Sequence, residues 1–324
     1  MAFVLRRLGY YLIAFWASLT INFLLPRLMP GDPVGRMLGQ MQNLTDDQVA
    51  QFRHLFGLDD RPVWQQYIQY IGDVFTGNLG LSISQFPTPV VQVIGAQLGY
   101  TILLGGTALV ISFVLGNLLG IWAAWRRGGA LDTIFPPLLV FTGSFPYFFI
   151  AMIALYLFAV TLKWFPIGQA FTLGTVPSFS GEFIGDLLLH LVLPAGTIVA
   201  VSVGGWMLGM RNTMIGTAAE DYITMARAKG LTERRIMYRY AARNAMLPSV
   251  TSFGMSIGFV VGGALLTEVV FAYPGIGYQL LRAVQALDYP LMQGIFLTLT
   301  GAVLVANFLI DIFYVRLDPR VRVR

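Results

Sequence analysis

The sequence predicts an all-α integral membrane protein with six transmembrane helices, and its composition and the lengths of its apolar runs carry this prediction. Of its 324 residues, 56% are hydrophobic and only 11% are Asp, Glu, Lys or Arg, whereas soluble domains carry about 25% charged residues. The mean hydropathy is +0.69. One aqueous core could not bury so many apolar residues, and their runs approach the roughly 20 residues that a helix needs to cross a bilayer.

The first span runs from about residue 8 to 25 and follows Arg6 and Arg7. A cleavable signal peptide is the alternative, but the run ends in Pro26-Arg27 instead of a small-residue cleavage site. We therefore expect an N-terminal tail and a retained first helix in residues 1–25.

Residues 26–98 are mixed in polarity, with turn signals such as PGDP and FPTP, and we expect an extracytoplasmic segment between the first two helices. Within it, Thr45 is a candidate N-cap for a short helix over 45–58. Residues 62–77 repeat apolar side chains at helical spacing, which predicts an amphipathic helix against other protein or the membrane surface.

The remaining residues, 99–324, form the predicted membrane core. Five apolar runs predict five further spans, at about 100–125, 134–162, 187–210, 249–272 and 290–315. The run at 134–162 contains Pro136, Pro137, Gly143 and Pro146. Prolines interrupt helices, so we expect a kink or a late start there.

The distribution of basic residues predicts the orientation. If the N-terminus is cytoplasmic, fifteen of the 21 Lys and Arg residues fall in inside segments, seven of them within 211–248. An excess of Lys and Arg marks cytoplasmic loops. Both termini are therefore expected in the cytoplasm, and membrane orientation explains the net charge of +5 better than a nucleic-acid partner does.

Several chemistries find no support in the residues. The sequence has no Cys, and its two histidines, His54 and His190, are far apart, so we expect hydrogen-bonded structural roles for them and no metal site. The nucleotide-binding motif GxxxxGK[ST] and the zinc motif HExxH are absent. We expect a non-catalytic protein that binds no cofactor itself.

A transporter without its own motor uses an ion gradient or takes work from a partner. Gradient-driven carriers place ionisable residues near the middle of the membrane, and these spans nearly lack them; Glu268 and Asp311 lie near span ends. A partner motor is favoured over a stand-alone secondary carrier or channel.

Residues 211–248 form the largest predicted cytoplasmic loop, and their local signals indicate two helices with a turn between them. Thr217 to Glu220 matches a capping box for a helix over about 218–229, Gly230 is a natural stop, and Thr232 is a second N-cap candidate. A purely electrostatic positive-inside loop explains the basic residues but not these helix signals.

This stretch, DYITMARAKGL…RNAMLP, resembles the coupling ("EAA") loop of ABC importer permeases of the dipeptide, oligopeptide and nickel family, in their B-type subunit. Further matching pieces extend along nearly the whole chain in order: PGDP (30–33), FGLDDRPVWQQY (56–67), GNLGLS (77–82), VVFAYPGIGYQLL (269–281), DYPLMQG (288–294) and NFLIDIFYVRLDPRVR (307–322). One departure is Thr224, where the general form of the loop has Glu six residues before the Gly.

The resemblance implies a type I importer permease fold in a bacterial or archaeal cytoplasmic membrane, in contact with lipid. It implies a second, paralogous permease subunit, two ATP-binding cassette ATPases that bind ATP and Mg²⁺, and an extracytoplasmic solute-binding protein. Peptides are the first substrate class it suggests, with oligosaccharides and nickel chelates as alternatives. The residues implied to contact an ATPase are Tyr222, Ala226, Arg227, Ala228, Lys229, Gly230 and Leu231.

Two features suggest a translocation path or a subunit interface. Gly254, Gly258 and Gly262 recur every fourth residue, and such stripes permit close helix contact, although packing within the chain is the alternative. Glu268 would be costly against lipid, so we expect it to face the path or another chain. Glycine pairs with the same spacing occur at 116/120 and 205/209.

Overall fold

The structure is a computed structural model that describes residues 2–28, 51 and 61–317 of the chain, and in these residues it consists of helices joined by turns. The chain divides into two compact units, one made of residues 1–101 and 274–324 and the other of residues 102–273. The helix predicted over 45–58 lies outside the described residues.

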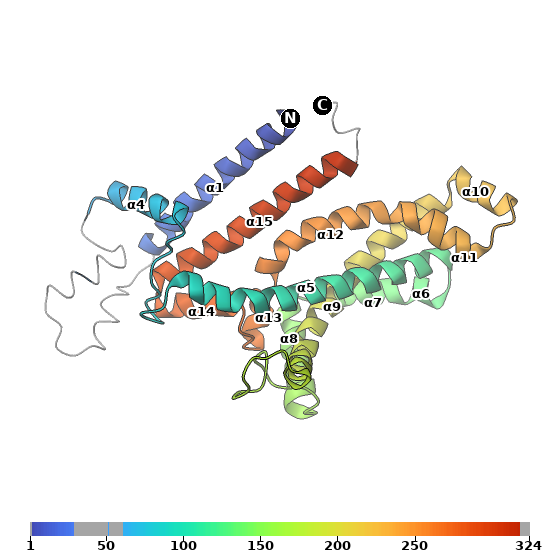
Figure 1. Ribbon diagram of the computed structural model, residues 1–324. Helices are drawn as coiled ribbons and strands as arrows, with labels where there is room; N and C mark the ends of the chain where they lie inside the picture. The colour runs from blue at the N-terminus through green and yellow to red at the C-terminus, as the bar shows by residue number, and fades with distance from the viewer. Residues whose placement is uncertain (1, 29–50, 52–60, 318–324) are drawn as a thin grey trace. The chain divides into compact units, whose positions relative to one another are not determined.

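In the first unit, the first and last long helices of the chain lie side by side (Figure 1). They are α1 (Ala2–Leu28) and α15 (Tyr289–Leu317). The Asp311 carboxylate on α15 accepts a hydrogen bond of 2.8 Å from the Tyr11 hydroxyl and lies 3.1 Å from the Arg7 guanidinium. These contacts give Asp311 a structural role in joining the two helices.

The amphipathic helix predicted over 62–77 is confirmed as α4 (Val63–Phe75). Its inward face packs against α1, where the Tyr67 hydroxyl lies 2.7 Å from that of Thr20 and the Tyr67 ring meets Phe23 edge to face. Gln66 accepts a hydrogen bond of 2.8 Å from Arg27. The same helix leaves apolar side chains exposed on its other face, including Trp64 and Ile68.

The start of α15 is held by a buried carboxyl group. One oxygen of Asp288 accepts hydrogen bonds from the Ser82 hydroxyl and from the backbone N–H and hydroxyl of Ser84. The other accepts from the backbone N–H of Leu291, which caps the helix. Asp288 thus fixes residues 82–84 to α15, and it follows an unpredicted helix, α14 (Ile276–Ala286).

The second unit is arranged around α9 (Gly181–Ala218), which extends beyond both ends of the span predicted at 187–210. Helices α7 (Phe135–Gly143), α8 (Tyr147–Ala154) and α12 (Arg243–Gly263) contact it. The helix before them, α5 (Val90–Trp125), begins about ten residues earlier than expected and passes from the first unit into the second.

Glycines allow α5 and α9 to approach closely. A Cβ atom on Gly120 would lie 2.6 Å from the Met207 carbonyl oxygen and 2.8 Å from the Cβ of Met210. Gly116 likewise contacts the segment around Trp206, whereas Gly205 and Gly209 have open space. The close spacing of Gly116 and Gly120 is therefore explained by helix packing within the chain, without a subunit interface.

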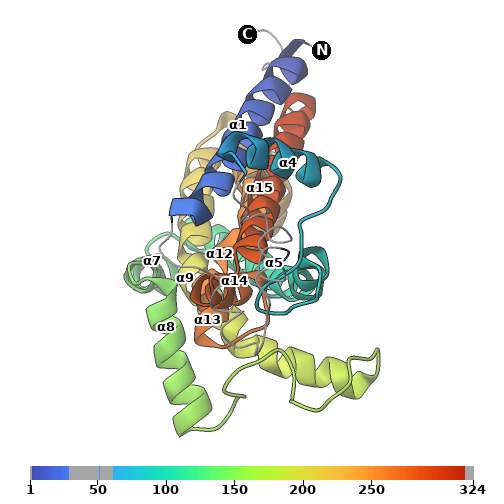
Figure 2. The same ribbon diagram turned by 90° about the vertical axis from the view of Figure 1, so that its left-hand side faces the viewer.

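The proline-rich third span is bent, as its sequence predicts. The stretch Ala130–Gly143 and the stretch Tyr147–Thr161 meet at 95°, and Pro146 precedes α8 at the break. Figure 2 shows α8 turning away from α7. Proline lacks a backbone N–H and disfavours helix in the residue before it, so the break falls here.

Four helices in the described part of the chain are long and apolar enough to cross a membrane, or five if the bent pair forms one span. They correspond to the predicted first, second, fourth and sixth spans and, as the bent pair, to the third. The predicted span at 249–272 is not among them; α12 carries several Ser and Gly residues and is separated from α13 (Leu265–Val270) at Ala264.

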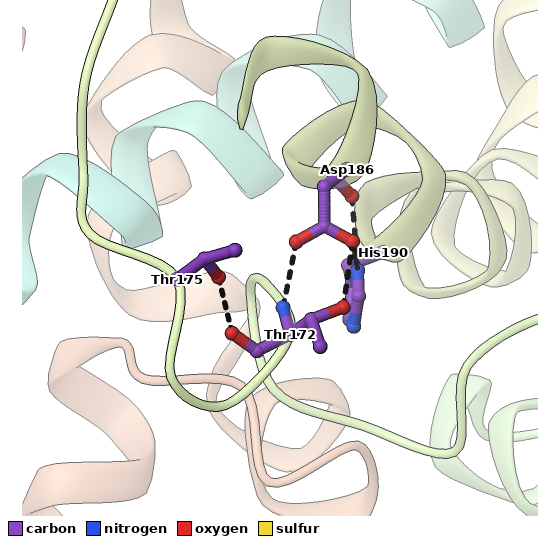
Figure 3. A network of polar contacts seen from close by, with 4 residues as sticks. All are labelled: Thr172, Thr175, Asp186 and His190. Atoms are coloured by element: carbon purple, nitrogen blue, oxygen red, sulfur yellow. Dashed lines mark hydrogen bonds and ion pairs between the residues drawn. The ribbon is translucent and has the colours of Figure 1, made fainter. Parts of the chain in front are cut away.

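The structural role expected for His190 is confirmed by a polar network at the start of α9 (Figure 3). Its Nδ1 atom lies 2.9 Å from the Asp186 carbonyl oxygen and 3.3 Å from the carboxylate. The same carboxylate accepts hydrogen bonds from the backbone N–H and hydroxyl of Thr172. The network ties the loop before α9 to that helix. His54 lies outside the described residues.

Candidate functional site: a short helix on an apolar base

The loop predicted at 211–248 is folded into helices within the second unit. After α9 ends at Ala218, α10 covers Asp221–Ala228, α11 covers Glu233–Arg235, and the π-helical segment η2 (Ile236–Ala242) leads into α12. Figure 1 shows α10 standing at the end where α9 finishes and α11 begins. The prediction of two helices around a turn is confirmed.

The capping box predicted for the first of these helices is wrong. Thr217 lies in the last turn of α9, where its hydroxyl donates to the Thr213 carbonyl 2.9 Å away. Glu220 occupies the N-cap position of α10, with no hydrogen bond from its side chain. The sequence pattern was misleading because Thr217 and Glu220 belong to different helix ends. Thr217 lies in the last turn of α9, and Glu220 precedes the first residue of α10.

Gly230 ends α10 as predicted. It has a φ of +70°, and its N–H donates to the Arg227 carbonyl oxygen 2.9 Å away. This left-handed conformation is open to glycine but strained for residues with a Cβ atom. The turn that follows brings Thr232 to the N-cap position of α11, again as predicted, without a hydrogen bond from its side chain.

Two buried side chains fix α10 on an apolar base. Ile223 is 0% exposed and Ala226 is 3% exposed, and both join an apolar cluster formed by the ends of three longer helices. The buried residues that these helices contribute are Ile121 and Ala124 from α5, Met210 and Met214 from α9, and Ile236, Ala241, Ala242 and Ala245 from the η2–α12 helix. An eight-residue helix is not stable alone, so this base holds α10 in place.

The remaining side chains of α10 face away from the base. Tyr222, Arg227, Ala228 and Lys229 are exposed, together with Gly230. Leu231, which follows the helix, is half-buried and packs against the base. Ala226, which is also among the predicted contact residues, packs inside the chain. Its contact with an ATPase stays a prediction. Met225 was not among the contact residues predicted from the sequence, and its side chain is 64% exposed.

The charge of Arg227 is used within the chain. Its Nε atom donates to the Glu233 carboxylate 3.1 Å away, and its guanidinium lies 5.6 Å from the centre of the Trp125 ring. The ion pair closes the turn between α10 and α11. Both side chains are at least half exposed, so the pair contributes little to stability, and its effect is to orient the turn.

Two further contacts tie the surrounding helix ends together. Arg211 on α9 donates to the Asp132 carboxylate at 2.6 Å, and the Trp122 indole N–H on α5 donates to the Tyr238 hydroxyl at 2.7 Å. The base of α10 is therefore linked to several helices by polar as well as apolar contacts.

The structure also shows a pocket that the sequence did not reveal. It lies beside α10, has a volume of about 500 Å³, and is lined by Tyr222, Arg235, Arg239, Tyr240, Arg243 and Asn244. Three arginines spaced four residues apart were visible in the sequence. Their convergence on a tyrosine of another helix required the fold.

The residues predicted to line a translocation path remain a prediction. Gly258 is buried and Gly254 half-buried on α12, while the surroundings of Gly262 are outside the description. Glu268 is 0% exposed.

The stretch from Gly254 to Gly258 matches the pattern GxSxG, which in some hydrolases carries a nucleophilic serine on a strand-to-helix turn. Here Ser256 lies inside the helix α12, and its hydroxyl donates to the Ser252 carbonyl oxygen. The match is therefore not such a turn.

Long apolar helices, with the short exposed helix α10 held on the ends of three helices, define a multi-pass membrane protein. Comparison with known families agrees. The family model described as "Binding-protein-dependent transport system inner membrane component" matches residues 116–323. The model for the N-terminal part of the same membrane component matches residues 1–97. The chain belongs to this family of importer permeases and lies in the cytoplasmic membrane.

Individual relatives match over almost their full length. A Brucella suis protein provisionally named as a peptide permease is 39% identical over 321 residues, covering 99% of both chains. The di/tripeptide transport system permease protein DppB of Pseudomonas aeruginosa is 34% identical, again covering 99% of both. The dipeptide transport system permease protein DppB of Escherichia coli K12 is 34% identical over 99% of this chain and 98% of its own. Members of this family are the non-catalytic permease components of their transport systems.

Proposed function

We propose that the chain is the permease subunit that forms half of the translocation pathway of an ATP-driven peptide importer. The observation that carries this proposal is α10, an exposed helix held on the ends of α5, α9 and α12 by Ile223 and Ala226. Such a helix can receive force from a cytoplasmic partner. The peptide and dipeptide permeases among its relatives suggest the cargo.

The proposed topology has six spans, with α12 and α13 as the fifth, both termini in the cytoplasm, and residues 26–98 outside. The excess of Lys and Arg in the inside segments, fifteen of 21, supports this orientation. It places α10 on the cytoplasmic side, where ATP is available, and it places residues 26–98 where a solute-binding protein could dock.

In the proposed mechanism, two ATPase subunits bind ATP and Mg²⁺, and one of them holds α10 by its exposed residues, which include Tyr222, Met225, Ala228 and Lys229. Closure of the ATPases moves α10 as a rigid body. Because the base joins α10 to three membrane helices, that movement switches the pathway between outward-facing and inward-facing states. A second, paralogous permease supplies the other half, and Glu268 and the α12 glycines lie along the path or its interface.

A substitution on the exposed face of α10 tests the docking. Ala228→Trp adds bulk at an exposed helical position without touching the base. We expect ATPase subunits to co-purify with the tagged wild-type chain and to be lost from this variant, together with uptake of a labelled dipeptide. Ala130→Trp, at the exposed first residue of the short helix α6 (Ala130–Thr133), is the matched control. Retention of ATPases and uptake by both variants would refute the docking role of α10.

A further inference from the structure

The basic pocket beside α10 combines charge with a defined shape. Arg235, Arg239 and Arg243 are spaced four residues apart on the continuous helix formed by α11, η2 and the start of α12. All three side chains are exposed and line the same pocket of about 500 Å³.

One residue of the pocket lining, Tyr222, belongs to α10. The Asn244 side-chain amide donates a hydrogen bond of 2.9 Å to the Tyr222 hydroxyl. This bond connects α10 to α12 and fixes the phenol ring at the pocket. Tyr222 therefore belongs both to the exposed side of α10 and to the lining of the pocket, so a protein that covers α10 also reaches the pocket mouth.

The three arginines differ from their neighbours in having no acidic partner in the part of the chain that the structure describes. Arg211 pairs with Asp132, and Arg227 pairs with Glu233. Among the described residues, no side-chain hydrogen bond or ion pair is formed by the guanidinium group of Arg235, Arg239 or Arg243. A guanidinium group covered by another protein without a counter-charge is strongly unfavourable, so whatever covers this pocket must bring anions.

We propose that the pocket binds carboxylate side chains of an acidic segment on the ATPase subunit that covers α10. This inference rests on the proposed function and adds the chemistry of the contact. The fork of N–H groups on each guanidinium matches a carboxylate in a bidentate arrangement. Three such groups lining one pocket fit a short run of acidic side chains better than a single headgroup phosphate. The pocket thus sets the register in which α10 is held.

Charge reversal in the pocket tests the proposal in the reconstituted chain. Arg239→Glu and the neutral Arg239→Gln are compared with Arg126→Glu, an exposed position in the turn after α5 with the same change in charge as the first variant. The measurement is the apparent Kd of purified ATPase subunits for the chain in nanodiscs, between about 50 and 500 mM salt. We expect Arg239→Glu to weaken binding at least about tenfold at low salt and to flatten the salt dependence.

The outcomes separate this proposal from the docking of α10. If ATPases bind the wild type and Ala228→Trp abolishes binding while both Arg239 variants bind normally, the pocket is not an acidic docking site and the proposed function stands. If no ATPase binds the wild type, both fail. Native mass spectrometry of the chain alone provides the other arm: anionic phospholipid retained by the wild type and lost in Arg239→Gln, with unchanged ATPase affinity, would assign the pocket to a headgroup instead.

Discussion

Replacing Ile223 by Ala should loosen α10 selectively. Ile223 is one of only two buried side chains on this eight-residue helix, and it is 0% exposed in the apolar base. The substitution removes three carbon atoms from the cluster, which at about 0.8 kcal/mol each amounts to about 2.4 kcal/mol. The cavity left behind adds to this cost, so that the total lies between about 2.4 and 5 kcal/mol.

Hydrogen exchange of the backbone amides in α10 measures this effect, because short elements open locally at a lower free energy than the whole protein. A loss of about 2.4 kcal/mol corresponds to exchange that is faster by roughly 50-fold, at about 1.4 kcal/mol for each factor of ten. Met225→Ala on the same helix is the control; its side chain is 64% exposed and its removal should change exchange little.

The reasoning would be refuted by exchange in α10 that differs by less than about threefold between Ile223→Ala and the wild type. Equal acceleration in both variants would also contradict it, because the buried and exposed sides of the helix would then contribute alike. Faster exchange confined to α10 in the Ile223 variant supports a helix that depends on its base.

Three further substitutions test other parts of the structure. Gly230→Ala should cost about 1–2 kcal/mol, because φ is +70° there, and faster exchange in the 229–232 turn would show it, whereas an unchanged turn would contradict the left-handed assignment. Asp288→Ala removes the acceptor for Ser82, Ser84 and Leu291, and we expect thermal unfolding in detergent to begin several degrees lower; since this follows from buried donors losing their partner at about 1–3 kcal/mol each, an unchanged midpoint would argue against the network. Gly120→Val should destabilise the α5–α9 contact by about 1–3 kcal/mol through overpacking, while Gly209→Val, which has open space, serves as its control in the same unfolding assay.

Local sequence signals were reliable where the cause of the structure is itself local. The apolar runs predicted helices long enough to span a membrane, Pro146 predicted the bend before α8, and Gly230 predicted the end of α10. Each depends on the conformational limits or polarity of a few adjacent residues. The capping box predicted at Thr217 was wrong because a local pattern of Thr and Glu does not show whether the preceding helix has already ended. In the structure α9 continues to Ala218.

The sequence alone determined four properties: the membrane class, the number of apolar runs, the turn at Gly230 and the family resemblance. Only the tertiary structure decided that Ala226 points inward while Met225 points outward, and that Arg235, Arg239 and Arg243 share a pocket with Tyr222. The physical reason is that burial and pocket formation depend on which distant helix ends meet. Ile121 and Met214 are far apart in sequence, and they make a base for α10 only after α5 and α9 have packed together.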